Sequence, residues 1–139
     1  MSTKSFKPVE KVLIVDDDES VRVYLRLALK TLGIREITEA SNGWEGVAEY
    51  FANEPDLVLM DINMPELQGP EAIRELRKMF PDARVVMVSS EATQKRVREA
   101  IRNGVVGFIR KDTAKDELLN LLASFLEPPK PKRPARQPA

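Results

Sequence analysis

The stretch from Val12 to Arg22 reads VLIVDDDESVR, four aliphatic residues followed at once by four acidic ones. A short run of Val, Leu and Ile is typical of a strand buried on both faces of a parallel sheet. Acidic residues at a helix N-terminus cap free amides and complement the helix dipole, which accounts for Asp18 and Glu19. Capping is a weaker account of the whole run, because at least one carboxylate must lie at the end of a buried strand. A metal or phosphate site is therefore favoured there.

The same arrangement recurs along the chain, with short apolar runs separated by segments of helical spacing. The further runs are Arg35–Ala40, Asp56–Met60, Arg84–Val88 and Val105–Ile109. The helical stripes are Val21–Leu32, Trp44–Ala52, Ile73–Phe80, Val97–Ile101 and Leu118–Leu126. Five strand–helix repeats with short loops predict a parallel sheet with helices on both faces. Ligands of such sheets bind outside the carboxyl ends of the strands, so functional residues are expected there.

Composition excludes several classes of protein. The chain has 139 residues, of which 42% are hydrophobic, and this suits one compact domain. It carries 22 basic and 22 acidic residues, so no overall charge attracts it to nucleic acid or to an anionic membrane. The absence of cysteine and histidine excludes disulfides, thiolate zinc sites, and cysteine or histidine nucleophiles. No apolar segment at the N-terminus is long enough for a signal or a span, so the expected location is cytoplasmic.

The two ends differ from the repeating region. Residues 1–9 form a short polar N-terminal tail, and the predicted domain covers residues 10–127. Residues 128–139 read PPKPKRPARQPA, with four basic residues, five prolines and no acidic residue. Because this segment has no aliphatic side chain larger than alanine, we expect a disordered or polyproline-like tail, or a linker to an output domain.

Further polar residues follow the later apolar runs. Asp61 ends the third run, Ser89 and Ser90 follow the fourth, and Lys111 follows the fifth. Asp61 could instead form an Asx turn, the serines could be turn residues or caps, and Lys111 could be solvated surface. If the first and third strands are neighbours, Asp61 converges with the acidic residues after the first.

Convergence of these carboxylates needs a compensating positive charge. Like charges at about 4 Å cost on the order of 4 kcal/mol per pair at an effective dielectric near 20. A few carboxylates with water suit Mg²⁺, and Lys111 is a natural ion-pair partner for them or for a bound anion.

Four strings together carry a resemblance to the receiver domain of two-component response regulators, and in particular to single-domain chemotaxis-type receivers. They are VLIVDDDESVR from Val12, LVLMDINMPELQG from Leu57, VVMVSSEA from Val85 and GFIRKD from Gly107. The resemblance implies a flavodoxin-like, doubly wound parallel sheet of five strands in the order 2-1-3-4-5, with five helices.

The resemblance also implies the roles of the acidic residues. Asp61 matches the phosphoacceptor, and Asp16 and Asp17 match the residues that hold Mg²⁺ directly or through water. Asp61 itself and the backbone carbonyl of Asn63 would complete the protein's share of the metal ligands.

Other matched positions act on the phosphoryl group or report its presence. Ser89 matches the hydroxyl that binds the phosphoryl group, and Lys111 matches the lysine that pairs with it. Phe108 matches the aromatic residue that switches with Ser89, though as a phenylalanine it lacks the commoner tyrosine hydroxyl. Asn63 and Glu91 match positions that tune the lifetime of the acyl phosphate.

Partners follow from the chemistry and the resemblance. Since the chain has no histidine, the donor must be a phosphohistidine on a sensor kinase or a phosphotransfer protein, or a small acyl phosphate. A downstream protein would bind the face of the fourth helix, fifth strand and fifth helix, with contacts at Arg96, Val105, Phe108 and Lys115. We expect a signalling module rather than a turnover enzyme, monomeric or dimerising on phosphorylation. The chain has no recognised DNA-binding motif, so we expect no direct contact with nucleic acid.

One further departure from the family pattern and two alternative functions remain. Asp112 stands where the family usually has proline, so the Lys111–Asp112 bond is expected to be trans, and Asp112 or Thr113 is expected to cap the last helix. A Mg²⁺-dependent phosphatase with an aspartyl nucleophile has similar chemistry. Such enzymes usually need a second carboxylate two residues after the nucleophile, where this chain has Asn63. A pseudo-receiver that only binds proteins is the other alternative. Against it, all five site positions of this chain carry residues that can take part in phosphorylation.

Overall fold

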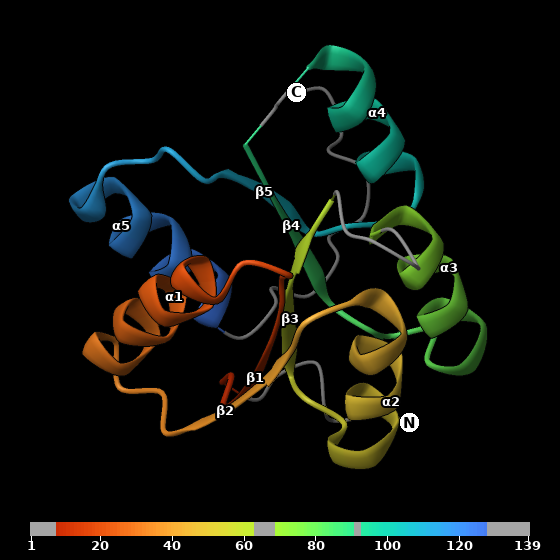
Figure 1. Cartoon of the computed structure of the whole chain (residues 1–139), viewed down its shortest axis with the longest axis horizontal. Coiled ribbons are helices and arrows are strands. Elements are labelled where there is room, and N and C mark those ends of the chain that lie inside the picture. Colours follow the sequence, from red (N-terminus) through yellow and green to blue (C-terminus); the bar gives the residue numbers. More distant parts are fainter. Residues whose placement is uncertain (1–7, 63–68, 91–92, 128–139) are drawn as a thin grey trace, which may run out of the picture.

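The apolar runs form one parallel sheet in the computed structural model, which describes residues 8–62, 69–90 and 93–127. Within these residues the strands are β1 (Lys11–Val15), β2 (Glu36–Ala40), β3 (Leu57–Asp61), β4 (Val85–Ser89) and β5 (Gly107–Arg110). Their order across the sheet is β2-β1-β3-β4-β5, and every pairing is parallel. The predicted fold class and strand order are confirmed (Figure 1).

Helices cover both faces of this sheet, as Figure 1 shows. The helices are α1 (Glu19–Thr31), α2 (Gly43–Asn53), α3 (Gly69–Met79), α4 (Gln94–Arg102) and α5 (Lys115–Leu126). In the figure α1 and α5 lie on one side of the strands, and α2, α3 and α4 lie on the other. Each helix begins after the carboxyl end of a strand, so all the strand-to-helix loops gather at one edge of the sheet.

Alternation along the strands builds two separate hydrophobic cores. In β1, Leu13 and Val15 face the core formed with α2, α3 and α4, whereas Val12 and Ile14 face the core formed with α1 and α5. All four side chains are buried, because a central parallel strand is covered on both faces. This burial explains why β1 reads as a continuous apolar run.

Local signals set the limits of the first two helices. Asp18 caps α1 by accepting a hydrogen bond from the Ser20 amide, and Asn42 caps α2 by accepting one from the Glu45 amide. Gly33 follows α1 at a φ of 95°, a left-handed conformation that glycine adopts without strain.

The start of α5 differs from the prediction. Its N-cap residue is Ala114, which makes no side-chain capping bond, so the expectation that Asp112 or Thr113 caps this helix is wrong. Both side chains turn back to Arg110 instead: Asp112 Oδ1 accepts from its guanidinium at 3.0 Å, and Thr113 Oγ1 donates to its carbonyl oxygen at 2.6 Å. The Lys111–Asp112 bond is trans, as expected, since the described residues contain no cis peptide bond.

Close packing joins α5 to the edge of the sheet. A Cβ atom at Gly107, the first residue of β5, would lie 2.2 Å from the ring of Phe125. The absence of a side chain therefore lets α5 approach the strand directly. Within the described ranges, no helix is both long and apolar enough to cross a membrane.

Candidate functional site

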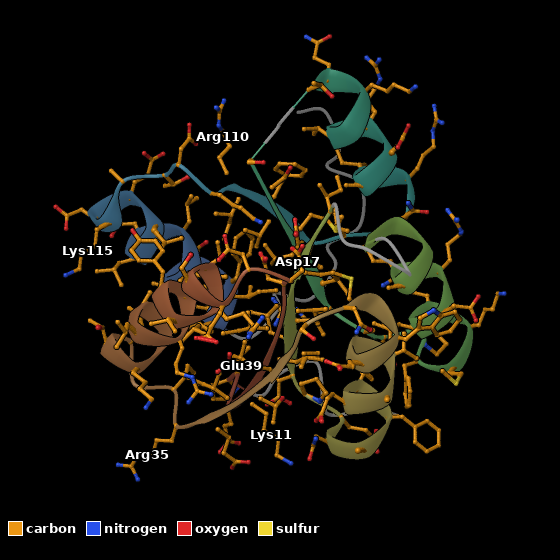
Figure 2. All side chains as sticks on the ribbon, viewed as in Figure 1. Lys11, Asp17, Arg35, Glu39, Arg110 and Lys115 are labelled. Carbon is orange, nitrogen blue, oxygen red and sulfur yellow. The ribbon has the colours of Figure 1, made fainter. Side chains whose placement is uncertain are left out.

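Three carboxylates converge at the carboxyl edge of the sheet. Asp16 and Asp17 follow β1, and Asp61 ends β3, which pairs directly with β1. One oxygen atom from each lies within 4.8 Å of the others. Figure 2 labels Asp17 at this edge and Lys11 at the opposite end of β1. The topology thus unites residues that are more than forty positions apart in the sequence.

Burial distinguishes the three acidic residues. Asp16 and Asp61 are only 1% and 3% exposed, whereas Asp17 is exposed. Burial raises the pKa of Asp16 above its usual range, although hydrogen bonding to the Asp18 amide and the charge of Lys111 oppose this shift. The buried carboxylates of Asp16 and Asp61 therefore repel each other when both are charged, and a bound cation would reduce this repulsion.

Lys111 supplies part of that positive charge. Its Nζ atom lies 3.0 Å from Asp16 Oδ2 and 3.3 Å from Asp61 Oδ2. Burial alone would lower the pKa of Lys111, but the two carboxylates outweigh burial and raise it. The Lys111 amide donates to the Ser89 carbonyl at 2.8 Å, which anchors the base of the lysine beside the end of β4.

One atom of the cluster suggests that a cation belongs there. Asp16 Oδ2 is buried and accepts no hydrogen bond from any residue that the structure describes. Its contact with Lys111 is the ion pair at 3.0 Å described above. A buried carboxylate oxygen with spare lone pairs, beside two more carboxylates, is a donor set that hard divalent cations such as Mg²⁺ prefer.

The predicted switch residues lie on adjacent strands. Ser89 ends β4 and is fully buried, and its neighbour Val88 pairs with Asp61. Phe108 in β5 is half-buried, pairs with Met87 and packs against the core on the α2–α4 side. Because strand residues alternate between faces, Ser89 lies on the same face of β4 as Met87, and hence on the face where Phe108 packs.

Some predicted residues cannot be placed. Asn63 and Glu91, predicted to tune the acyl phosphate and in the case of Asn63 to ligate the metal, lie outside the described residues. Helix α4 is described, but the side chain of Arg96, a predicted partner contact, is not.

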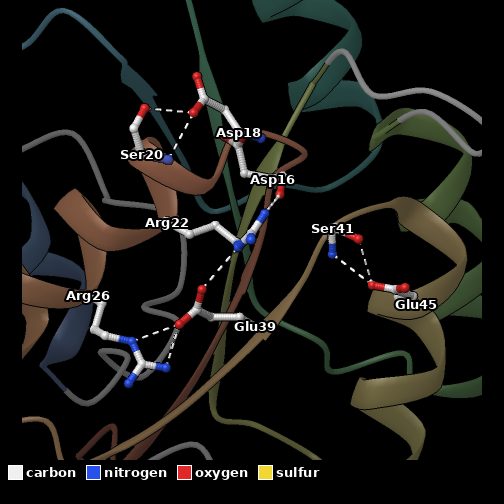
Figure 3. A network of polar contacts seen from close by, with 8 residues as sticks. All are labelled: Asp16, Asp18, Ser20, Arg22, Arg26, Glu39, Ser41 and Glu45. Atoms are coloured by element: carbon white, nitrogen blue, oxygen red, sulfur yellow. Dashed lines mark hydrogen bonds and ion pairs between the residues drawn. The ribbon is translucent and has the colours of Figure 1, made fainter.

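The site has a polar neighbour that the sequence analysis did not single out. The Arg22 side chain connects Glu39 of β2 with the main-chain oxygen of Asp16, as Figure 3 shows. The arginine follows the acidic run by only a few positions, and its distance to Glu39 depends on the pairing of β1 with β2, so the contact is a product of the fold.

A pocket of about 210 Å³ also adjoins the site between α1, β5 and α5. Lys111 contributes to its lining, together with apolar residues such as Val21, Leu25 and Ile109. The lining comes from α1, β4, β5, α5 and the loop before α5, so periodicity along the chain could not have indicated a pocket here.

Known proteins with the same motifs match the chain over most of its length. The family model of the response regulator receiver domain matches residues 12–123. The chemotaxis protein CheY of Thermotoga maritima is 41% identical over 102 residues, which are 73% of this chain and 85% of that protein. CheY of Bacillus subtilis is 37% identical over 116 residues, which are 84% of this chain and 97% of that protein. The chain therefore belongs to the response regulator receiver domain family.

Solved structures agree with this assignment. The CheX–CheY–BeF₃–Mg²⁺ complex from Borrelia burgdorferi contains a chain that superposes with a TM-score of 0.78 at 27% identity, covering 85% of this chain and 90% of that one. CheY4 of Vibrio cholerae superposes with a TM-score of 0.76 at 27% identity, covering 84% and 98%. The chain is a receiver domain of the CheY type, and receivers of two-component systems are signalling domains.

Proposed function

We propose that this receiver accepts a phosphoryl group on Asp61 from a phosphohistidine of a partner protein, with Mg²⁺ bound beside it. The observation that supports the proposal most directly is the meeting of Asp61 with Asp16, Asp17 and Lys111 at one edge of the sheet. The donor must be external, since the chain contains no histidine. A sensor histidine kinase or a histidine phosphotransfer protein provides that chemistry.

The transfer forms one bond and breaks one. A carboxylate oxygen of Asp61 attacks phosphorus while the phosphorus–nitrogen bond of the donor breaks, and the leaving imidazole keeps the electron pair and takes up a proton. The obstacle is repulsion between two anions. The Lys111 ammonium, 3.3 Å from Asp61 Oδ2, is close enough to stabilise the charge on the phosphoryl oxygens as it develops.

The metal would be held by the carboxylates of Asp16, Asp17 and Asp61, with the Asn63 carbonyl as a further ligand. When bound, Mg²⁺ would neutralise part of the phosphoryl charge and orient the group for attack. The buried Oδ2 atom of Asp16, which accepts no hydrogen bond from the described part of the chain, supports this assignment. Ser89, buried at the end of β4, would donate its hydroxyl to a phosphoryl oxygen.

Phosphorylation would be read out on the surface of α4, β5 and α5. Drawing the Ser89 hydroxyl toward the phosphoryl group would leave room for the Phe108 ring, which packs on the same face of the sheet. Val105 and Lys115 lie on this surface and would contact a downstream protein.

Incubation of the full chain with acetyl phosphate and Mg²⁺, followed by intact-mass measurement, tests the proposal. We expect a gain of one phosphoryl group that is lost on exposure to alkali, because acyl phosphates hydrolyse there. A matched incubation with EDTA in place of Mg²⁺ should show little gain. A protein that gains no mass with Mg²⁺ would instead be a pseudo-receiver.

A further inference from the structure

Arg22 connects the loop of acidic residues to two other elements. From the first turns of α1, its Nη1 atom donates to the main-chain oxygen of Asp16 at 2.7 Å. Its Nε atom donates to Oε1 of Glu39 in β2 at 2.9 Å. The side chain is only 15% exposed, and Figure 3 shows the guanidinium lying between Glu39 and Asp16. Both contacts are therefore made where solvent competes weakly.

The contact falls on the peptide group that joins Asp16 to Asp17. A peptide group is planar, so a bond that fixes its oxygen also fixes the direction of the chain into Asp17. The Asp16 amide on the other side donates to the Ala40 carbonyl at 3.0 Å, which ties the loop to the end of β2. Arg22 thus restrains the segment that connects one buried and one exposed carboxylate of the cluster.

We propose that Arg22 is a positioning residue of the metal site, with Glu39 as its anchor. By holding the Asp16–Asp17 peptide, it sets the direction in which these two residues present their carboxylate oxygens. The inference rests on the proposed function, since it assigns Arg22 a role only if the three carboxylates bind a divalent cation.

The sign of the effect separates positioning from simple electrostatics. A guanidinium near a cation site repels the cation, so a purely electrostatic role predicts that its removal tightens metal binding. A positioning role predicts weaker binding, because the carboxylates lose their preferred arrangement. Residues that orient metal ligands from outside typically change metal affinity about 10- to 100-fold when they are replaced.

Arg26 offers a matched control one helical turn further along α1. Its Nε atom donates to Oε2 of the same Glu39 at 2.7 Å. Among the described residues no hydrogen bond or ion pair joins Arg26 to Asp16, so Arg26→Met removes a comparable charge from the same carboxylate and leaves the loop contact intact. Arg22→Lys is the complementary variant: it keeps the charge, but an ammonium cannot span Glu39 and the Asp16 carbonyl as the planar guanidinium does.

The test measures binding of Mn²⁺, as a stand-in for Mg²⁺, to the full chain through loss of the electron paramagnetic resonance signal of the free ion. This readout requires no phosphorylation. We expect Arg22→Met to weaken binding about 10- to 100-fold, Arg22→Lys to weaken it as well, and Arg26→Met to change it less than about twofold. Circular dichroism reports whether each variant is folded; if Arg22→Met is not, the comparison of Arg22→Lys with Arg26→Met decides.

Three results would overturn the inference. Binding by Arg22→Met that is as tight as wild type, or tighter, would assign Arg22 at most an electrostatic role. Equal weakening by Arg26→Met would place the effect on Glu39 rather than on the loop contact. A wild-type chain that binds neither Mn²⁺ nor Mg²⁺ would overturn the metal site of the proposed function, and the role of Arg22 with it. The first two results leave that proposed function intact.

Discussion

Lys111, in the loop after β5, lies 3.3 Å from the carboxylate of Asp61 at the end of β3, although β4 separates the two strands. The lysine reaches across one strand because its amide is held by the Ser89 carbonyl and its long side chain runs along the edge of the sheet. The same ammonium also pairs with Asp16 after β1. The Lys111 ammonium therefore connects the carboxyl ends of β1, β3 and β5. The site depends on the strand order β1-β3-β4-β5 within the sheet.

Replacement of the proposed phosphoacceptor is expected to abolish phosphorylation. Asp61→Asn should show no mass gain with acetyl phosphate and Mg²⁺, because the amide lacks the anionic oxygen that attacks phosphorus. Asp18→Asn is the matched control: Asp18 lies in the same acidic run but caps α1 through Ser20, and asparagine can serve as a cap as well. Undiminished labelling of Asp61→Asn would show that another residue accepts the group.

Magnesium is expected to stabilise the fold, because the cluster of carboxylates exists only in the folded state. At a concentration 100-fold above the dissociation constant, the gain in the free energy of unfolding is about 2.7 kcal/mol. For a domain of this size that gain raises Tm by roughly 10 °C. Asp17→Asn should remove most of the dependence on Mg²⁺, since it removes the negative charge of one of the three carboxylates. A wild-type Tm that is the same in EDTA and in excess Mg²⁺ would contradict the metal site.

Without metal, Asp16 is expected to make the fold less stable at neutral pH. Its pKa is raised in the folded protein, chiefly by burial, so the folded state binds the proton more tightly than the unfolded chain does. Protonated Asp16 therefore stabilises the fold at a pH below the ordinary pKa of aspartate. This contribution is lost as the pH rises through the pKa that Asp16 has in the folded protein. In EDTA, urea unfolding should therefore find Asp16→Asn more stable than wild type at pH 7, with the difference shrinking toward pH 4.

Replacement of Asp18, in the same acidic run, is expected to change the stability at neutral pH in the opposite direction. Hydrogen bonds from Ser20 lower the pKa of Asp18, so its carboxylate favours the folded state above the ordinary pKa and this contribution disappears as the pH falls. Asp18→Ala should therefore lower stability at pH 7. If Asp16→Asn raises the stability at pH 7 and Asp18→Ala lowers it, the position of each aspartate in the loop, and not its acidity alone, decides how it affects stability. A loss of stability in Asp16→Asn at pH 7 would show that its ion pair with Lys111 outweighs its burial.

Removal of residues 128–139 is expected to leave phosphorylation unchanged. The segment carries four basic residues and five prolines but no large apolar side chain, so it has no surface to contribute to a core. A chain that ends at Glu127 should react with acetyl phosphate at a rate within about a factor of two of the full chain. A clearly slower reaction would mean that these residues act on the site.

The sequence predicted the elements well because β1, β3 and β4 are covered on both faces of the sheet, and each therefore contains four consecutive apolar residues. The positions of Asp16, Asp61 and Lys111 followed from that pattern, since each comes at the end of a strand. The contact of Arg22 with Glu39 could not be predicted in the same way, because it depends on the register of β1 against β2.

At the start of α5 the prediction from local sequence was wrong, because the expected capping residues make a different contact. Asp112 and Thr113 are residue types that cap helices, but both are drawn to Arg110. Ala114 is left at the N-cap position without a side-chain bond. The acidic first turn at Asp116 and Glu117 instead complements the helix dipole.

The last prediction concerns how phosphorylation changes the surface of α4, β5 and α5. Phe108 is half-buried against the core on the α2–α4 side, on the same face as Ser89, so inward movement of the Ser89 hydroxyl gives the ring room to become more buried. A shift of a few kcal/mol suffices, about what one charge-assisted hydrogen bond and burial of part of a ring provide. Amide chemical shifts recorded with Mg²⁺ and beryllofluoride, a phosphoryl mimic, should therefore change along residues 93–110 as well as around Asp61. Ser89→Ala is the matched variant, because it should still bind the mimic at Asp61 but lose the changes in β5. If residues 93–110 stay unmoved in the wild-type chain, this receiver does not signal through that surface.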